Sequence, residues 1–203
     1  VEVDVRTIDA SATAGADYSA VSQTLLFPSG VTSKNINIPI FNDGSSEDNE
    51  TIIISLSNPI NASLDNSTAF LTIEDDDPAP QISIADSTAN EDVANVVVSL
   101  NAPAGKNVSV TASTIGGTAI ENTDYNYFTQ NITFLPGENS KTLNIPIHND
   151  TLYENDEQFQ VVISNPSFGT IADNSSLVTI VSDDPKPIVS IASSSASEAS
   201  DNQ

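Results

Sequence analysis

Residues 140–166, SKTLNIPIHNDTLYENDEQFQVVISNP, contain the pattern from which the rest of the chain can be interpreted. Their first part alternates apolar and polar residues and places Leu143, Ile145 and Ile147 on one face. This period of two is typical of a β-strand with one buried side. A segment rich in acids follows, and a second alternating segment then leads into the turn sequence Ser-Asn-Pro. The pattern predicts a strand, an acidic loop and another strand.

An earlier stretch repeats this pattern. Residues 33–59, SKNINIPIFNDGSSEDNETIIISLSNP, lie 107 positions upstream (140 − 33 = 107), and at this offset the chain aligns with itself without a gap. Such self-similarity is the signature of a repeat architecture. The predicted units are an incomplete first repeat, a complete repeat and the first strand of a third repeat, at residues 1–77, 78–184 and 185–203.

The two ends of the chain fall inside repeats. The first repeat lacks counterparts of residues 81–107, whereas the tail supplies counterparts of residues 81–96. One interpretation is that the chain is a piece excised from a longer array, and we prefer it. The other is that subunits complete one another by donating a strand, which pairs with the open edge of a neighbour's sheet.

The composition restricts the partners of the chain. It has 28 Asp and Glu residues against 5 Lys and Arg residues, which gives a formal net charge of −23. Such a charge argues against nucleic acid or an anionic membrane as a partner. No apolar run approaches the roughly 18 residues that a membrane helix needs, so we expect no membrane insertion of this segment. With one His, no Cys and no Gly-rich phosphate loop, we expect no enzymatic activity.

The complete repeat shows the alternation of β-strands throughout and sustains no helical period. About seven short strands in roughly 100 residues are typical of an antiparallel sandwich of the immunoglobulin type. We therefore predict an all-β fold of tandem seven-stranded immunoglobulin-like sandwiches. The candidate strands of the complete repeat are residues 81–85, 95–101, 107–113, 130–135, 140–147, 158–164 and 175–181.

Acidic residues follow alternate predicted strands of the complete repeat. Where successive strands reverse direction, the ends of the first, third, fifth and seventh strands lie at the same end of a sandwich. The loops at the opposite end are much poorer in acids. The sequence therefore predicts that distant carboxylates converge at one tip. The converging residues are Glu91, Asp124, Asp150, Glu154, Glu157, Asp183 and Asp184.

Carboxylates gathered without Lys or Arg among them raise one another's pKa values or bind a cation. Calcium takes six to eight oxygen ligands with flexible geometry, so seven acids are enough for a cluster of about two to four ions. Magnesium needs tighter geometry and keeps its waters, whereas zinc prefers His or Cys, and His148 is the only histidine. Calcium is therefore the predicted cofactor.

The ordered elements of the repeat resemble the Calx-beta family. Residues 15–59, GADYSAVSQTLLFPSGVTSKNINIPIFNDGSSEDNETIIISLSNP, contain the Asp-Tyr pair, the F-x-x-G turn, the SK-x-x-x-I-P-I strand, the D-x-x-x-E-x-x-E segment and the SNP turn of a Calx-beta repeat. Residues 122–166 contain the same elements, and an acidic DDP sequence closes each unit. The resemblance covers nearly the whole chain. It implies a seven-stranded sandwich that binds several calcium ions at one tip.

The resemblance also implies which residues are calcium ligands. In the complete repeat they are the seven converging acids named above. Asn42 and Asn149 stand where a further Asp is common in the family, and Ser182 replaces the counterpart of Asp75. In the first repeat the implied ligands are Asp17, Asp43, Glu47, Glu50, Asp75, Asp76 and Asp77. Glu198 is the implied first ligand of a third site.

The position of the acids beside the linkers indicates a mechanical function. The linkers at residues 75–81 and 183–188 contain two prolines each, so adjacent units cannot move far apart. Calcium bound there is expected to stiffen the junction. We therefore predict a calcium-stabilised spacer or filament-forming segment of a large extracellular surface or adhesion protein, where calcium is millimolar. The expected partners are calcium ions and neighbouring repeats, of the same chain or of identical subunits arranged head to tail.

Three alternatives stay open. The chain could be a calcium-sensing regulatory module of a membrane protein, like the repeats of sodium–calcium exchangers in the same family. It could be a subunit that builds filaments by strand donation. Ligand binding at the end opposite to the acids ranks last, because Phe168 is the one evident aromatic residue there.

Overall fold

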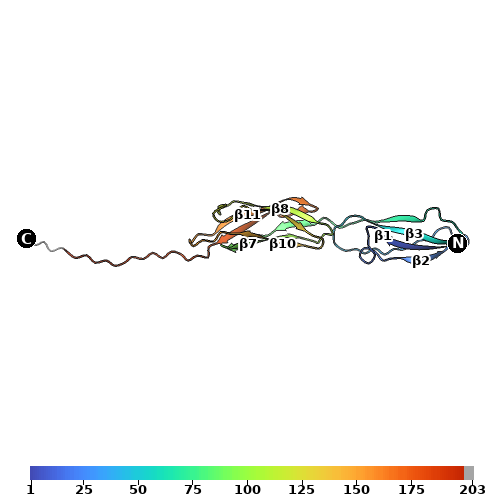
Figure 1. The fold of residues 1–203 in the computed structure, drawn as a ribbon, viewed down its shortest axis with the longest axis horizontal. Coiled ribbons are helices and arrows are strands. Elements are labelled where there is room, and N and C mark those ends of the chain that lie inside the picture. Colours follow the sequence, from blue (N-terminus) through green and yellow to red (C-terminus); the bar gives the residue numbers. More distant parts are fainter. Residues whose placement is uncertain (199–203) are drawn as a thin grey trace, which may run out of the picture.

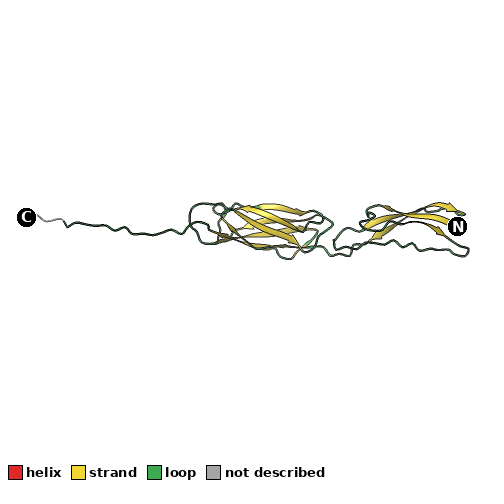
Figure 2. Ribbon diagram, turned by 90° about the horizontal axis from the view of Figure 1, so that it is seen from below, coloured by secondary structure: helices red, strands yellow, loops and turns green. Residues whose placement is uncertain are grey.

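The computed structural model describes residues 1–198, which form two β-units arranged end to end (Figure 1). Strands and loops make up this part of the chain, and it contains no helix (Figure 2). The predicted all-β class is therefore confirmed. These residues accordingly include no helix that is long and apolar enough to cross a membrane.

The second unit is a sandwich of two sheets. One sheet has the strand order β10-β7-β5-β12, and the other has the order β6-β13-β11-β8-β9. Neighbouring strands are antiparallel, except that β12 pairs with β5 and β13 pairs with β6 in parallel. The strands are β5 Gln81–Ile84, β6 Ser87–Asn90, β7 Val93–Leu100, β8 Val108–Ile115, β9 Thr129–Phe134, β10 Ser140–Pro146, β11 Glu157–Ser167, β12 Thr170–Ile171 and β13 Ser175–Val181.

The core of the second unit lies between these two sheets. Alternate residues of β7, among them Val96 and Val98, are fully buried, as the period of two predicts. Phe159 of β11 stacks on Tyr125, with 4.2 Å between the ring centroids. Strands β6 and β12 were not predicted, because β6 (STAN) contains a single apolar residue and β12 has only two residues, so neither shows an alternation.

The first unit consists of one sheet with the order β2-β1-β3-β4. Each of its strands is the counterpart of a strand in the β6-β13-β11-β8-β9 sheet at the offset of 107 residues. The counterpart of β10 is residues 33–39, which belong to no strand. Strand β10 pairs with β7, and residues 1–198 contain no counterpart of β7 for the first unit. The strands are β1 Glu2–Asp9, β2 Ser22–Leu26, β3 Glu50–Ile60 and β4 Thr68–Ile73.

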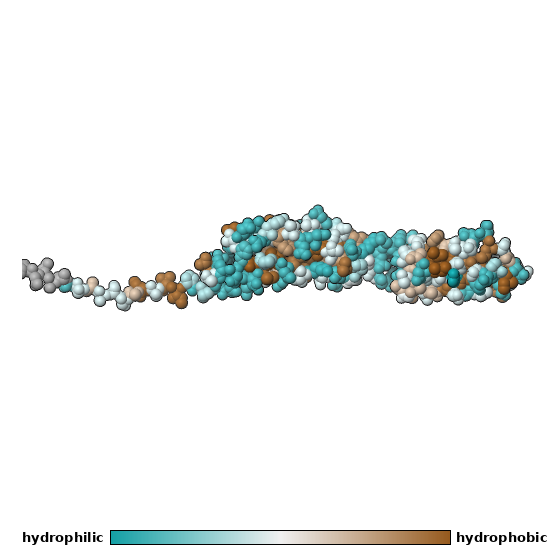
Figure 3. Space-filling model, in the orientation of Figure 1, coloured by the Kyte–Doolittle hydropathy of each residue, from teal (hydrophilic) through white to brown (hydrophobic). Residues whose placement is uncertain are grey.

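The first unit accordingly has a thin core. Its buried cluster consists of Ala12, Tyr18 and Ile52, with partly buried apolar neighbours. Ile40 is 43% exposed, whereas its counterpart Ile147 is 6% exposed. In the view of Figure 3, hydrophobic side chains are visible on the surface of the first unit.

The two units are joined by residues 74–80, between β4 and β5. Beyond β13, residues 182–198 contain no strand and lead away from the second unit on the side opposite to the first (Figure 1). The third repeat predicted at residues 185–203 stays a prediction, and residues 199–203 lie outside the described part of the chain.

Candidate metal centre

Acidic side chains from separate loops meet at one tip of the second unit. Six of the seven predicted acids form two groups of three, and the carboxylate oxygens within each group lie within 4.8 Å of one another. Asp183 is exposed and belongs to neither group. The first group is Glu91, Asp150 and Asp184, and the second is Asp124, Glu154 and Glu157.

The strands explain this convergence. Glu91 directly follows β6, Asp124 lies between β8 and β9, and Glu157 is the first residue of β11. Asp150 and Glu154 lie in the loop between β10 and β11. These strand ends share one end of the sandwich, so acids far apart in the sequence become neighbours.

Two carboxylate oxygens of the first group have no hydrogen-bond partner. Glu91 is 5% exposed, and its Oε2 is buried without a donor, as is Oδ2 of Asp184. A buried carboxylate without a partner is costly, because it has lost its hydration and gained nothing in return. A cation held between these oxygens removes that cost. The tip therefore fits a metal ion, because two of its carboxylate oxygens are buried and have no hydrogen-bond donor.

Backbone hydrogen bonds hold other ligand oxygens in place. One Asp124 oxygen accepts a hydrogen bond from the Ile120 amide at 2.5 Å, and one Asp150 oxygen accepts from the Leu152 amide at 2.6 Å. Each bond orients a carboxylate and leaves its second oxygen available to a cation. Nδ1 of His148 lies 2.7 Å from a backbone oxygen of the adjoining loop, which indicates a structural role for this residue.

The crowding of acids perturbs their titration. Burial, followed by hydrogen bonding and repulsion from Asp124, raises the pKa of Glu157 to about 7. Burial and the charges of Asp124 and Asp150 raise the pKa of Glu154. The protein therefore favours either a proton or a metal cation at these carboxylates.

The first unit has a tip of the same design. The side chains of Asp17, Glu47 and Glu50 form a group within 4.8 Å. Asp17 accepts a hydrogen bond from the Thr13 amide at 2.6 Å, and Asp43 accepts from the Ser45 amide at 2.7 Å, as their counterparts do in the second unit. One cleft is lined by all the ligands predicted for this unit, which are Asp17, Asp43, Glu47, Glu50, Asp75, Asp76 and Asp77.

Burial is also the first cause of the raised pKa values in this cleft. It raises the pKa of Glu47 together with the charges of Asp43 and Asp17. It likewise raises the pKa values of Glu50 and Asp77, each beside neighbouring carboxylates. Both tips therefore concentrate negative charge that a divalent cation would relieve.

Not every predicted ligand joins a group of three. Asp76 is exposed, and Asp75 lines the cleft with one oxygen 3.4 Å from the Ser46 hydroxyl. In the second unit Ser182 replaces Asp75, and its hydroxyl accepts from the Glu154 amide at 3.4 Å. Glu198 lies in the exposed tail and belongs to none of the groups of three.

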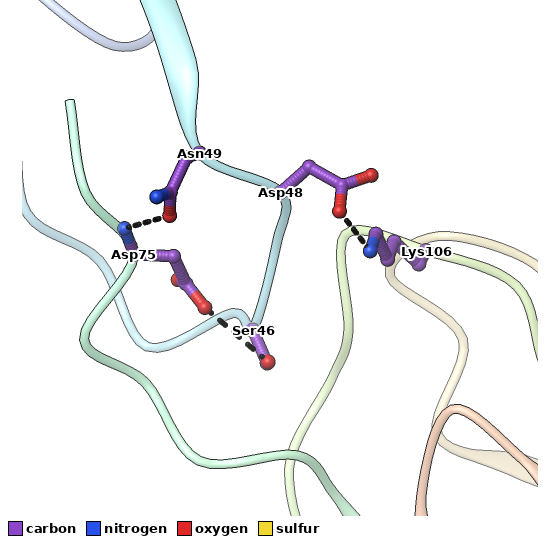
Figure 4. Close-up of polar contacts among 5 residues, drawn as sticks. All are labelled: Ser46, Asp48, Asn49, Asp75 and Lys106. Atoms are coloured by element: carbon purple, nitrogen blue, oxygen red, sulfur yellow. Dashed lines mark hydrogen bonds and ion pairs between the residues drawn. The ribbon is translucent and has the colours of Figure 1, made fainter. Parts of the chain in front are cut away.

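The structure adds a feature that the sequence analysis missed, a contact between the first tip and the second unit. Lys106, in the loop between β7 and β8, forms an ion pair with Asp48 (Figure 4). Ala104 and Ser46 form an isolated β-bridge, and the Gly105 amide donates to the Ser46 carbonyl at 3.1 Å. No local pattern could reveal this contact, because it depends on how two units are placed.

These features define a class of protein, tandem β-units with acidic, cation-binding tips. The Calx-beta domain family model matches residues 1–77 and 79–184, and the chain belongs to this family. Carboxylate-rich tips with flexible loop ligands are the kind of site that calcium occupies, and calcium is the ion that fits these residues.

Similar proteins include an ion exchanger and an extracellular matrix protein. The chain is 30% identical over 205 residues to sodium/calcium exchanger 1 of Bos taurus, a match that covers 88% of this chain and 21% of the exchanger. It is 30% identical over 169 residues to extracellular matrix protein 3 of Lytechinus variegatus, covering 77% of this chain and 5% of that protein. The chain thus spans at most about a fifth of the length of these two relatives.

A solved structure is also similar. The crystal structure of the apo-form Calx CBD1 domain is 25% identical, with a TM-score of 0.49. The match covers 53% of this chain and 100% of that domain.

Proposed function

We propose that this chain is a calcium-stabilised spacer in an extracellular surface or adhesion protein, with a structural role and no catalysis. The observation that carries the proposal is the position of the first tip. Its acidic cleft lies at the junction of the two units, in contact with a loop of the second. An ion bound there therefore acts on the joint between units as well as on one unit.

The contact between residues 46–48 of the first unit and residues 104–106 of the second unit couples the cleft to the junction between the units. A side chain at Gly105 would collide with Glu47, so the second unit packs directly against a predicted ligand. Lys106 pairs with Asp48 and lies 4.5 Å above the ring of Phe168 in its own unit. When Glu47 is held in one position, the surface that receives the loop of residues 104–106 is held as well.

Calcium, when bound, supplies positive charge that relieves the repulsion among the carboxylates. The protein's own residues supply the orientation, through the backbone amides that fix Asp17 and Asp43. Without a cation, burial and then the charges of Asp43 and Asp17 raise the pKa of Glu47, so an ionised carboxylate is unfavourable in this cleft. We expect the loops of the tip, and with them the joint, to loosen first.

Scattering with and without calcium tests this function. Small-angle X-ray scattering of the chain in 2 mM calcium, a concentration chosen from the millimolar affinity of extracellular modules, is expected to show a narrower range of interunit arrangements than in chelator. The melting temperature is expected to rise with calcium. Identical scattering and melting in both conditions would reject the spacer.

Two glycine variants test whether the contact between the units carries the effect of calcium on their arrangement. Gly105→Ala is expected to displace Glu47 and to weaken the effect of calcium on the interunit arrangement. Gly44→Ala lies in the same acidic loop and has open space around its added carbon, so it serves as the matched control. The proposal fails if the two variants respond to calcium alike.

The relationship to exchangers favours a second candidate, a calcium-sensing module of a membrane protein. The similarity to sodium/calcium exchanger 1 extends over both units of this chain. A sensor needs affinity near the micromolar range, whereas an extracellular spacer works at millimolar calcium. Calorimetric titration separates the two functions by the dissociation constant alone.

A further inference from the structure

Asp9, the last residue of β1, anchors the loop that carries Asp17. Its Oδ1 accepts one hydrogen bond from the hydroxyl of Tyr18 at 2.6 Å and a second from the backbone amide of Ala14 at 3.0 Å. Tyr18 is 1% exposed, so its hydroxyl needs an acceptor within the protein. One carboxylate oxygen therefore fixes the loop at a residue before Asp17 and at a residue after it.

This anchor reaches the acidic group of the first tip through a short stretch of backbone. Asp17 accepts a hydrogen bond from the Thr13 amide at 2.6 Å, and Thr13 immediately precedes the anchored Ala14. The carboxylate of Asp17 belongs to the acidic group of three, whereas Asp9 belongs to no such group among the described residues. Asp9 therefore acts on the acidic group through the loop, by holding the backbone that orients Asp17.

The second unit contains the same loop without the anchor. At the offset of 107 residues Gly116 replaces Asp9, and a glycine has no side chain that could accept a hydrogen bond. The backbone of the two loops follows the same course. Gly15 and its counterpart Asn122 both have a positive φ, of 93° and 67°, and each amide donates to the carbonyl oxygen three residues later, at 2.9 Å and 2.7 Å. The difference between the loops is therefore the anchor.

We propose that Asp9 is a positioning residue that preorganises the first tip for a cation, and that Gly116 leaves the second tip without this preorganisation. The physical reason is entropic, because a ligand that is already held in its bound orientation loses less freedom when the ion arrives. The inference rests on the proposed function in one respect, since it takes calcium to bind at the tips. Opposite substitutions at the two positions are therefore expected to change calcium affinity in opposite directions.

The second unit has room for the missing anchor. Apart from its chain neighbours, a Cβ added at Gly116 would have one atom within 4 Å, the hydroxyl oxygen of Tyr125 at 3.7 Å. Tyr125 is the counterpart of Tyr18 and is also 1% exposed. The φ of Gly116 lies outside the left-handed region, so other residues can adopt this backbone conformation. A side chain with an acceptor at this position lies beside the hydroxyl that corresponds to the one held by Asp9.

Substitution of Asp9 tests the loss of the anchor. Asp9→Ala removes the acceptor and is expected to weaken calcium binding at the first tip about fivefold, which is the size of one net hydrogen bond. Asp9→Asn keeps an oxygen acceptor without the charge and is expected to restore the affinity to within about twofold of that of the unaltered chain. An NMR titration of the whole chain with calcium reads the first tip from the amides of Thr13 and Ser45, and the second tip from those of Ile120 and Leu152.

Asp4→Ala is the matched control for stability. Asp4 lies earlier on the same strand and accepts hydrogen bonds from Thr24 and Asn58, at 2.5 Å and 2.9 Å. Its substitution removes two hydrogen bonds from the first unit and is expected to leave the calcium affinity of both tips unchanged. If Asp4→Ala weakens binding at the first tip as much as Asp9→Ala does, general destabilisation is the cause and the inference is wrong. Equal losses for Asp9→Ala and Asp9→Asn also overturn it, because the charge of Asp9 is then responsible.

The reverse substitution tests the gain of an anchor. Gly116→Asn is expected to strengthen calcium binding at the second tip about fivefold. Gly116→Ala adds a side chain without an acceptor and is expected to leave the affinity unchanged. In the metal-free protein, hydrogen exchange of the Glu121 amide, the counterpart of the Ala14 amide, is expected to slow in Gly116→Asn and not in Gly116→Ala. If both variants give the same affinity at the second tip, the inference is overturned.

The same measurements separate failure of this inference from failure of the proposed function. Calcium binding that Asp9→Ala leaves unchanged overturns the inference and leaves the spacer standing. Calcium binding that depends on Asp9 but does not alter the scattering of the chain supports the inference and rejects the spacer. A chain that binds no calcium at either tip rejects both.

Discussion

The two units have the same sequence pattern but different cores. SKTLNIP (residues 140–146) forms β10 in the second unit, whereas SKNINIP (residues 33–39) forms no strand in the first unit, although both alternate in the same way. The difference is the neighbour, because β10 pairs with β7 over seven residues, and no such strand adjoins residues 33–39 within the described chain. An alternating segment is thus a strand only where another backbone accepts its hydrogen bonds.

The acidic tips differ far less than the cores. Both collect carboxylates from the same loops and fix two aspartates by the same amide hydrogen bonds. Each of these loops adjoins a strand of the sheet that is present in both units, such as β8 or β11 in the second unit. The comparison shows that the strands next to a site, rather than the whole sandwich, position most of its carboxylates.

The largest expected effect is on the core of the second unit. Phe159→Ala removes a fully buried ring that stacks on Tyr125 and is expected to cost about 3–5 kcal/mol of stability. Ile52→Ala, at the matching position of the first unit, is expected to cost about 2 kcal/mol, because fewer buried residues surround it. Hydrogen exchange resolved by unit measures both. Val97→Ala, on an exposed position of β7, serves as the control. A larger loss in the first unit contradicts the comparison of cores.

The next effect is on calcium affinity at the second tip. Asp184→Asn removes a charge from the group that contains the buried, unpartnered oxygens and is expected to weaken binding about tenfold, or about 1.4 kcal/mol. Asp183→Asn changes the exposed neighbouring residue and is expected to weaken binding less than about twofold. Calorimetric titration measures both. Equal losses would show that the grouping of acids does not identify the ligands.

Stability without calcium is expected to depend on pH. Folded Glu157 keeps its proton up to about pH 7, whereas its ordinary pKa is 4.5. Between these values the folded state binds more protons than the unfolded state, so the free energy of unfolding falls as pH rises. Glu157→Gln is expected to flatten this fall. Chemical denaturation of the metal-free protein from pH 4 to pH 8 measures the slope.

Glu138 provides a control of opposite sign. The pKa of Glu138 is lowered by hydrogen bonds from Lys141 and the Leu135 amide, so its contribution to stability is present above the ordinary pKa and is lost as pH falls through the folded value. Glu138→Gln is therefore expected to leave the fall between pH 4.5 and 7 in place. If both variants flatten the curve equally, the crowding at the tip is not its cause.

The smallest expected effect concerns the joint. Lys106→Met breaks an exposed ion pair across the units and is expected to cost about 0–1 kcal/mol. It is expected to widen the range of interunit arrangements, which residual dipolar couplings report. Lys141→Met, which breaks a pair inside the second unit, is the matched control and should leave that range unchanged. If the two variants give the same residual dipolar couplings, the range of interunit arrangements does not depend on Lys106.

Much of this architecture could be predicted from local patterns. Val96, Val98 and Leu100 alternate with polar residues, and β7 is a strand because that alternation matches the pleat of a sheet. Acids placed after alternate strands converge because successive strands reverse direction, which brings Glu91 beside Asp184 although they are far apart in the sequence. Strand order, by contrast, depends on which segments are available to pair. The parallel strand β6 could not be predicted because it contains a single apolar residue, Ala89.

The sequence by itself determined the repeat of 107 residues, the strand-forming segments and the acids that meet at each tip, since period and spacing are local properties of the chain. The tertiary structure decided which acids form a group, left two oxygens buried without donors, and set Lys106 against the acidic loop of the other unit. It also leaves residues 33–39 outside any strand. Each of these outcomes depends on a neighbour distant in the sequence, and hydrogen bonding and burial are satisfied only when that neighbour is in place.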